Sequence, residues 1–125
     1  MKEHSMNAGL IYICSPLSAP SRAEMLANAA KAGAYMMRAE AEFKVKAVAP
    51  HAYLPYLLDD TIPEQRALAL DFGRKLLGMC SMMIVFGAYI SSGMAGEIGL
   101  AKELNISVMY RPDMDGTIYQ DERSA

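Results

Sequence analysis

The alternation of short apolar segments with longer helical patterns is the feature of this 125-residue chain that most constrains its fold. The strand-like segments are residues 8–14, 44–49, 82–86 and 106–110. The helical patterns between them are residues 21–42, 61–78 and 92–104. Such alternation is typical of right-handed βαβ units, whose parallel sheet is covered by helices on both faces. We therefore expect a small doubly wound α/β domain, a Rossmann-like or flavodoxin-like three-layer sandwich with four to five parallel strands. It is expected to occupy residues 1–110, with residues 111–125 as a C-terminal tail.

Two of the helical patterns begin with a recognisable capping signal. Ser21 has Glu24 three residues later, and Thr61 has Glu64, and both pairs match the capping box that satisfies the free N–H groups of a helix start. Along the second helix an inward apolar face is expected at Leu68, Phe72, Leu76 and Leu77. The segment 51–60 shows no clean period and is expected to be a loop that includes one short turn.

Composition narrows the class of protein. The net charge is -2, and Lys and Arg are spread along the chain, so no electrostatic footprint for nucleic acid is present. No apolar run approaches the ~18 residues of a membrane span, and the N-terminal residues lack the apolar core of a signal peptide. We expect a cytoplasmic protein that contacts neither nucleic acid nor membrane.

Metal and cofactor signals are also missing from the sequence. Cys14 and Cys80 each end an apolar segment, which favours reduced, buried thiols over a disulfide. With only His4 and His51 beside them, no set of metal ligands is evident. Neither a GxGxxG sequence nor a P-loop follows the first strand, which weighs against a dinucleotide oxidoreductase and a P-loop kinase. We expect no metal and no cofactor.

Candidate site residues follow the predicted strands, because ligands of doubly wound sheets bind outside the carboxyl ends of the strands. These segments are residues 14–22, 50–56 and 87–97. Ser91, Ser92 and Gly93 open a helix, where free N–H groups and the helix dipole favour an anion such as a phosphate. The alternative for Ser92 is a simple helix cap. Ser15 and His51 directly follow two strands, and both are candidates for substrate contact.

Glu97 is a carboxylate in an unexpected place. At 100° per residue it shares one side of its helix with Met94, Ala101 and Leu104, the face expected to be buried. Burying an unpaired carboxylate costs several kcal/mol, or the group takes up a proton. Either a structural salt bridge or hydrogen bond explains its place, or a functional role does.

The first strand and the Glu97 helix resemble the nucleoside 2-deoxyribosyltransferase superfamily, closest to its uncharacterised, often phage-borne members. The stretches that carry the resemblance are Ile11-Tyr12-Ile13-Cys14-Ser15-Pro16, Phe86-Gly87 and Ser91-Ser92-Gly93-Met94-Ala95-Gly96-Glu97-Ile98-Gly99-Leu100-Ala101. It covers roughly residues 8–110. It implies a parallel α/β sheet, an oligomer such as a homodimer, a nucleoside or nucleotide as substrate, and Glu97 as the nucleophile that attacks the sugar's anomeric carbon.

Other roles carried over from the superfamily differ in how well the residues match. Tyr12 matches a strand tyrosine that lines the active site, and Ser91 matches the serine that binds the 5′-phosphate in the branch acting on deoxynucleoside 5′-monophosphates. The superfamily's base-handling aspartate falls on Gly73, and a second common aspartate falls on Ser81. Asp71 is two residues from Gly73, about 200° around a helix, and replaces that acid only if the helix shifts.

The chemistry implied is a double displacement at an N-glycosidic bond. Glu97 must be ionised to form a glycosyl ester, which water or a second base then resolves. Burial raises the pKa of Glu97, whereas the helix dipole and the Tyr12 hydroxyl favour its anion. Asp71 and His51 are the candidate acids for the departing base. A nucleotide-binding module without catalysis, and a purely structural domain, are the alternatives.

Overall fold

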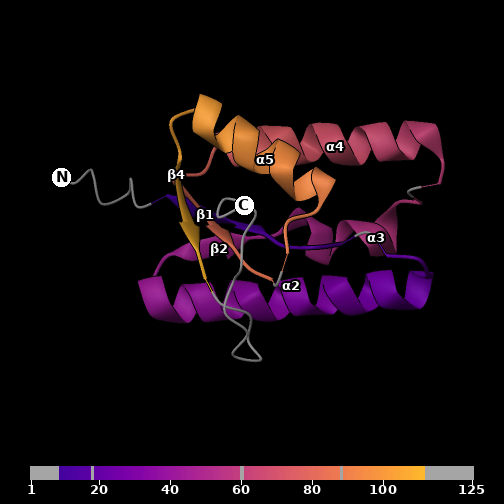
Figure 1. The fold of residues 1–125 in the computed structure, drawn as a ribbon, viewed down its shortest axis with the longest axis horizontal. Helices are drawn as coiled ribbons and strands as arrows, with labels where there is room; N and C mark the ends of the chain where they lie inside the picture. Colours follow the sequence, from indigo (N-terminus) through magenta and orange to yellow (C-terminus); the bar gives the residue numbers. More distant parts are fainter. Residues whose placement is uncertain (1–8, 18, 60, 88, 112–125) are drawn as a thin grey trace.

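A parallel sheet of four strands organises the computed structural model, which describes residues 9–17, 19–59, 61–87 and 89–111 (Figure 1). The strands are β1 (Leu10–Cys14), β2 (Lys46–Val48), β3 (Met82–Val85) and β4 (Ser107–Tyr110). They lie in the order β2-β1-β3-β4, and every neighbouring pair is parallel. The order reverses between β1 and β3, so the ligand crevice of such a sheet is expected where these two strands end.

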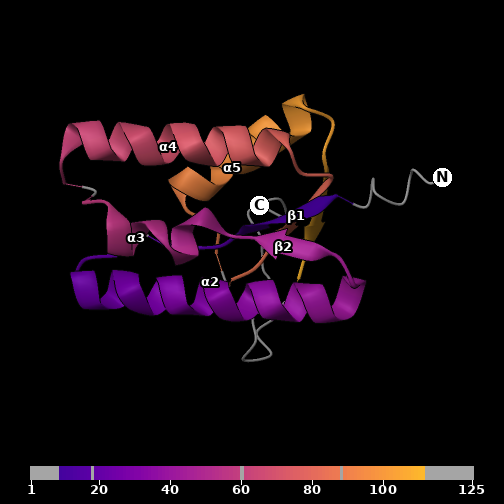
Figure 2. The same cartoon turned by 180° about the vertical axis from the view of Figure 1, so that it is seen from behind.

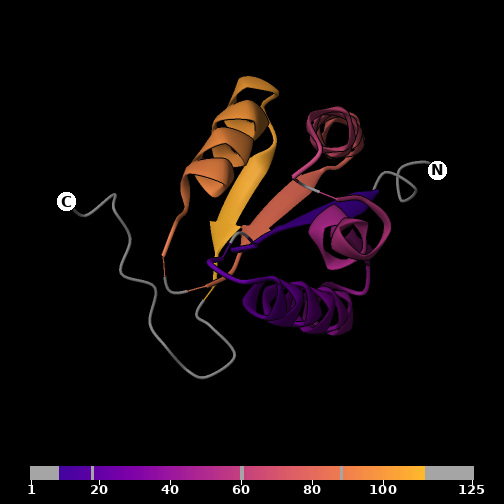
Figure 3. The same cartoon turned by 90° about the vertical axis from the view of Figure 1, so that its right-hand side faces the viewer.

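Helices cover both faces of the sheet. Helix α2 (Arg22–Phe43) packs on one face, and α4 (Pro63–Gly78) and α5 (Ser92–Glu103) lie on the other (Figures 2 and 3). A short 3-10 helix, η1 (Pro50–Ala52), and one helical turn, α3 (Leu54–Leu57), follow β2. The predicted doubly wound three-layer sandwich is therefore confirmed. The segment 51–60, expected to be a loop with one short turn, contains the end of η1 as well as the turn α3.

The alternation of side chains along β1 separates two hydrophobic cores. Ile11 and Ile13 face α2, where Tyr35 stacks on Phe86 with ring centroids 4.4 Å apart. Tyr12 and Cys14 face the opposite way, into the core under α4 and α5. Successive residues of a strand point to opposite faces. The sequence position of Tyr12 thus places its ring beneath the helix that carries Glu97.

The helix start at Ser21 agrees with the sequence in its cap, but the Glu24 carboxylate accepts from the Ser21 hydroxyl at 3.1 Å and does not complete the expected capping box. The other two helix starts differ from the prediction. Ser21 caps α2 by accepting a hydrogen bond from the Glu24 N–H at 3.1 Å. Helix α5 is capped by Ser91 rather than Ser92. The capping box expected at Thr61 is absent, because the Thr61 hydroxyl donates to the Asp59 carboxylate at 2.7 Å, and α4 begins after Ile62 with no side-chain cap.

The inward face of α4 also differs from the prediction. Leu77 is buried as expected, but Leu68 and Phe72 are 58% and 50% exposed. The side of α4 that turns inward carries Gln65, Ala69 and Gly73, which line a cavity rather than a packed core. An apolar period therefore does not mark the inward face of this helix.

Several other expectations concern thiols, ligands and the ends of the chain. Cys14 and Cys80 are free and buried, as predicted. Within the described residues, no three His, Cys, Asp or Glu side chains are grouped as metal ligands, and no helix has the length and apolarity that a membrane crossing requires. Residues 112–125 of the expected tail lie outside the described residues.

Candidate functional site

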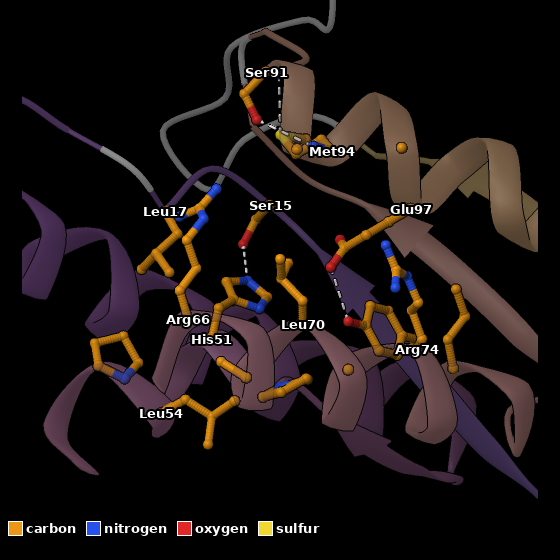
Figure 4. Close-up of a pocket in the computed structure, with 18 of the residues that line it drawn as sticks. Ser15, Leu17, His51, Leu54, Arg66, Leu70, Arg74, Ser91, Met94 and Glu97 are labelled. Carbon is orange, nitrogen blue, oxygen red and sulfur yellow. Dashed lines mark hydrogen bonds between the residues drawn. The ribbon is translucent and has the colours of Figure 1, made fainter. Parts of the chain in front are cut away.

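A cavity of about 470 Å³ opens at the carboxyl ends of the strands, between the sheet edge, α3, α4 and α5 (Figure 4). All three segments expected to form a site contribute to it. Tyr12 and Ser15 come from β1 and its end, His51 follows β2, and residues 91–97 follow β3. Apolar side chains form much of the wall, among them Leu17, Met25, Leu54, Leu58 and Leu70.

Glu97 lies in the wall of this cavity and is held by Tyr12. The Tyr12 hydroxyl donates a hydrogen bond of 2.9 Å to Glu97 Oε2. Burial raises the pKa of Glu97, and the Tyr12 hydrogen bond and the nearby Cys14 thiol oppose that rise without cancelling it. No cation among the described residues forms an ion pair with Glu97. The two structural explanations for this carboxylate are a salt bridge and a hydrogen bond. The described chain contains the hydrogen bond but not the salt bridge.

Position along α5 changes one expectation about Glu97. The helix begins at Ser92, so Glu97 is in its second turn. The favourable effect of a helix dipole on an anion falls off within the first turn. The Tyr12 hydroxyl and the Cys14 thiol, rather than the helix end, are therefore the groups that favour the carboxylate anion.

Tyr12 and Cys14 stay protonated beside this carboxylate. Burial raises the pKa of the Tyr12 hydroxyl, and the negative charge of Glu97 raises it further. The same two causes raise the pKa of the Cys14 thiol. Tyr12 can therefore orient and stabilise a carboxylate by donating its hydrogen bond, but it does not release that proton at neutral pH.

Ser15 and His51 form a second polar pair in the cavity. Ser15 Oγ and His51 Nε2 share a hydrogen bond of 2.7 Å, and Ser15 is buried. Burial lowers the pKa of His51 to about 4. The imidazole is therefore neutral at pH 7, which suits a hydrogen-bonding contact for a ligand better than a general acid.

Ser91, Ser92 and Gly93 line the cavity at the start of α5. The Ser91 hydroxyl accepts a hydrogen bond of 3.2 Å from the Met94 N–H, so it serves as the helix cap. Ser92 and Gly93 are exposed at the first two helical positions, where the N–H groups of a helix have no partner within the helix.

Asp71 does not line the cavity. It pairs with Lys75 at 3.1 Å on the outer side of α4, and its side chain is 57% exposed. Gly73 faces inward instead, and a Cβ atom at that position would lie 3.5 Å from the Tyr12 hydroxyl oxygen. The helix did not shift to bring Asp71 inward, so the 200° between the two positions separates this acid from Glu97. Ser81 is not among the lining residues either, and its hydroxyl donates to the Leu10 carbonyl at 3.2 Å.

Two arginines of α4 in the cavity wall were missed by the sequence reasoning. Arg66 and Arg74 line the cavity together with Leu70, which lies between them at helical spacing (Figure 4). Residues four and eight positions apart share one side of a helix. The sequence feature that could have predicted this face of α4 is the pair of arginines eight residues apart, with Leu70 midway between them.

Comparisons with known proteins support the fold. A family model described as "Domain of unknown function (DUF7768)" matches residues 9–111. Among solved structures, a 2-deoxyribosyltransferase from the psychrotolerant bacterium Bacillus psychrosaccharolyticus superimposes with a TM-score of 0.60. The two sequences are 17% identical, and the match covers 82% of this chain and 72% of that enzyme. At this identity the likeness shows a shared fold. No curated protein matches the chain.

Proposed function

The chain belongs to the DUF7768 family of domains of unknown function, and we propose that it cleaves or transfers the N-glycosidic bond of a nucleoside or nucleotide. The substrate is a deoxynucleoside or ribonucleoside, or its 5′-monophosphate, and Glu97 is the nucleophile. One observation carries the proposal. The Glu97 carboxylate, without an ion-pair partner among the described residues and oriented by Tyr12 at 2.9 Å, lines a cavity at the strand ends.

In the proposed reaction, a Glu97 carboxylate oxygen attacks the anomeric carbon while the base departs with the electrons of the glycosidic bond. The product is a glycosyl ester, which water resolves in a hydrolase and a second base resolves in a transferase. Two displacements retain the configuration at the anomeric carbon. The hydrogen bond from Tyr12 holds the Glu97 carboxylate in one orientation.

The size and lining of the cavity support a nucleoside-sized ligand. Its volume of about 470 Å³ falls within the roughly 300–1,000 Å³ of small-molecule sites. Apolar side chains such as Leu54 and Leu70 offer surface for a base. Ser91, Ser92 and Gly93 offer a helix start to a 5′-phosphate, as the superfamily resemblance of Ser91 suggests.

The same proposal includes a homodimer or larger homo-oligomer in the cytoplasm. The exposed apolar side chains of α4, Leu68 and Phe72, support an association through this helix. Sedimentation of the purified protein tests it, and a monomer across the working concentration range would contradict it.

Base release tests the catalytic proposal. The protein is incubated with a panel of deoxynucleosides, ribonucleosides and their 5′-monophosphates, with and without a free acceptor base, and products are separated by chromatography. Glu97→Gln keeps the shape of the side chain and removes the nucleophile, so release or exchange of base should stop. Glu103→Gln, an exposed position on the same helix, is the matched control and should retain full turnover. Turnover that survives in Glu97→Gln would refute the assignment.

A nucleotide-binding module without catalysis is the second candidate. It is favoured by the position of Asp71 outside the cavity, which leaves Glu97 as the one carboxylate among the described lining residues. This candidate predicts that a nucleotide raises the melting temperature yet is recovered intact after long incubation. Appearance of free base that depends on Glu97 would eliminate it.

A further inference from the structure

Among the described residues that line the cavity, none is suited to protonate a departing base at neutral pH. Besides Glu97, the described lining residues with ionisable protons are Tyr12, His51, Arg66 and Arg74. Burial raises the pKa of Tyr12 and lowers that of His51 to about 4, so the first holds its proton and the second has already lost it. Arginine remains charged in proteins and is not a proton donor in catalysis. General acid catalysis therefore has no candidate in the described wall.

Arg74 offers the other way to stabilise a leaving group, which is a fixed positive charge. It lines the cavity from α4 as an exposed residue, and no hydrogen bond or ion pair engages it among the described residues. In Figure 4 its guanidinium group rises from α4 toward the helix that carries Glu97. Its neighbour Gly73 has no side chain and leaves open the space beside the Tyr12 hydroxyl. The cavity therefore has room next to the Tyr12 hydroxyl, beside the same helix that carries Arg74.

We propose that the base departs as an anion stabilised by Arg74, and that the substrates are nucleosides of oxo-pyrimidines such as uracil and thymine. This inference rests on the proposed N-glycosidic reaction. The bond between the anomeric carbon and N1 of the base breaks, and its electron pair stays on the base. A Glu97 oxygen supplies the pair for the new bond to carbon. The base anion, with its charge spread onto its carbonyl oxygens, is held by the guanidinium and takes its proton from water after release.

The oxo-pyrimidines follow from this chemistry. A ring nitrogen leaves as an anion most easily when its N–H form is acidic, and two ring carbonyls make it so by delocalising the charge. The same carbonyl oxygens accept hydrogen bonds from a planar guanidinium fork. Cytosine carries an amino group in place of one carbonyl, so its anion is more basic and is a poorer leaving group.

A leaving-group series tests the proposal. Values of kcat/KM are measured for the 5′-monophosphates of deoxyuridine, 5-fluorodeoxyuridine, thymidine and deoxycytidine, and for the free nucleosides. The rate should rise from cytosine through thymine and uracil to 5-fluorouracil, as the departing anion becomes less basic. Arg74→Gln should lower kcat for deoxyuridine monophosphate by about 100-fold, the effect of removing one donor to a developing anion. The loss should be smaller for 5-fluorouracil, and Arg74→Lys should restore part of the rate.

Arg38→Gln is the matched control, because Arg38 is exposed on α2 and does not line the cavity. Unfolding by urea verifies that each variant is folded. Turnover with no dependence on the leaving group, faster release of cytosine than of uracil, or full activity in Arg74→Gln would overturn this inference and leave the Glu97 reaction standing. Absence of turnover with every nucleoside would overturn both proposals.

Discussion

His51 should make the stability of this protein sensitive to acid. In the folded chain burial lowers the pKa of its imidazole from 6.5 to about 4. The unfolded chain therefore binds one more proton than the folded chain between these two values. The contribution of His51 to stability is complete above the unfolded pKa of 6.5 and is lost as the pH falls toward 4. One pKa unit corresponds to about 1.4 kcal/mol, so the loss amounts to about 3 kcal/mol.

Urea unfolding of the wild type and of His51→Gln, at about pH 7.5 and about pH 4, isolates this contribution. Glutamine can keep a hydrogen bond to Ser15 but does not titrate. Carboxylates that titrate in the same range are common to both proteins and cancel in the comparison. The difference in unfolding free energy should shift by about 3 kcal/mol in favour of the variant on acidification. A difference that is the same at both pH values would refute the lowered pKa of this imidazole.

Three further substitutions test the site and its frame. Glu97→Gln should raise the free energy of unfolding at neutral pH, because the raised pKa of Glu97 in the folded chain means that its ionisation destabilises the fold. The wild type should accordingly become less stable as the pH rises through that raised pKa. A less stable variant by urea unfolding would contradict this. Gly73→Ala should stabilise α4 by about 0.5–1 kcal/mol yet weaken nucleotide binding by calorimetry, since its methyl group would lie 3.5 Å from the Tyr12 oxygen; unchanged affinity would speak against ligand occupying that space. Gly87 has φ +112° and a Cβ there would lie 2.8 Å from Pro16 Cδ, so Gly87→Ala should destabilise by about 1–3 kcal/mol, and an unchanged melting temperature would disprove the strain.

Much of the fold and the centre of the site could be predicted from the sequence. The strands are short apolar runs bounded by turn residues, and a parallel sheet brings their carboxyl ends to one edge. The parity of β1 sends Tyr12 to the face under α5, and the helical period of α5 sends Glu97 toward the sheet. Local periodicity therefore suffices to place these two side chains on facing surfaces. Their 2.9 Å hydrogen bond depends on tertiary packing and required the structure.

The α4 side of the cavity could not be predicted in the same way. Hydrophobic periodicity reports the face of a helix that packs into a core. The inward face of α4 instead borders a cavity, with Ala69 and Gly73 turned in and Leu68 and Phe72 turned out. Asp71 lies outside the cavity because it is on the outer side of α4, as Phe72 is.

A competing hydrogen bond within the loop explains why the cap predicted at Thr61 does not form. Its hydroxyl bonds to Asp59 two residues earlier, and short-range side-chain bonds of this kind compete with helix caps. Sequence spacing alone does not distinguish this bond from the expected cap. Asp59 and the Glu64 N–H are both close enough in the sequence for the Thr61 side chain to reach.

The most direct test of the central claim is to locate the covalent intermediate. The protein is mixed with a deoxynucleotide that it accepts as a substrate, and the reaction is quenched with acid during the first turnovers. The protein is then digested, and its peptides are measured by mass spectrometry. A deoxyribosyl phosphate should be found on the peptide that contains Glu97, and it should be absent from Glu97→Gln. Release of base with no adduct, or with an adduct on another residue, would contradict nucleophilic catalysis by Glu97.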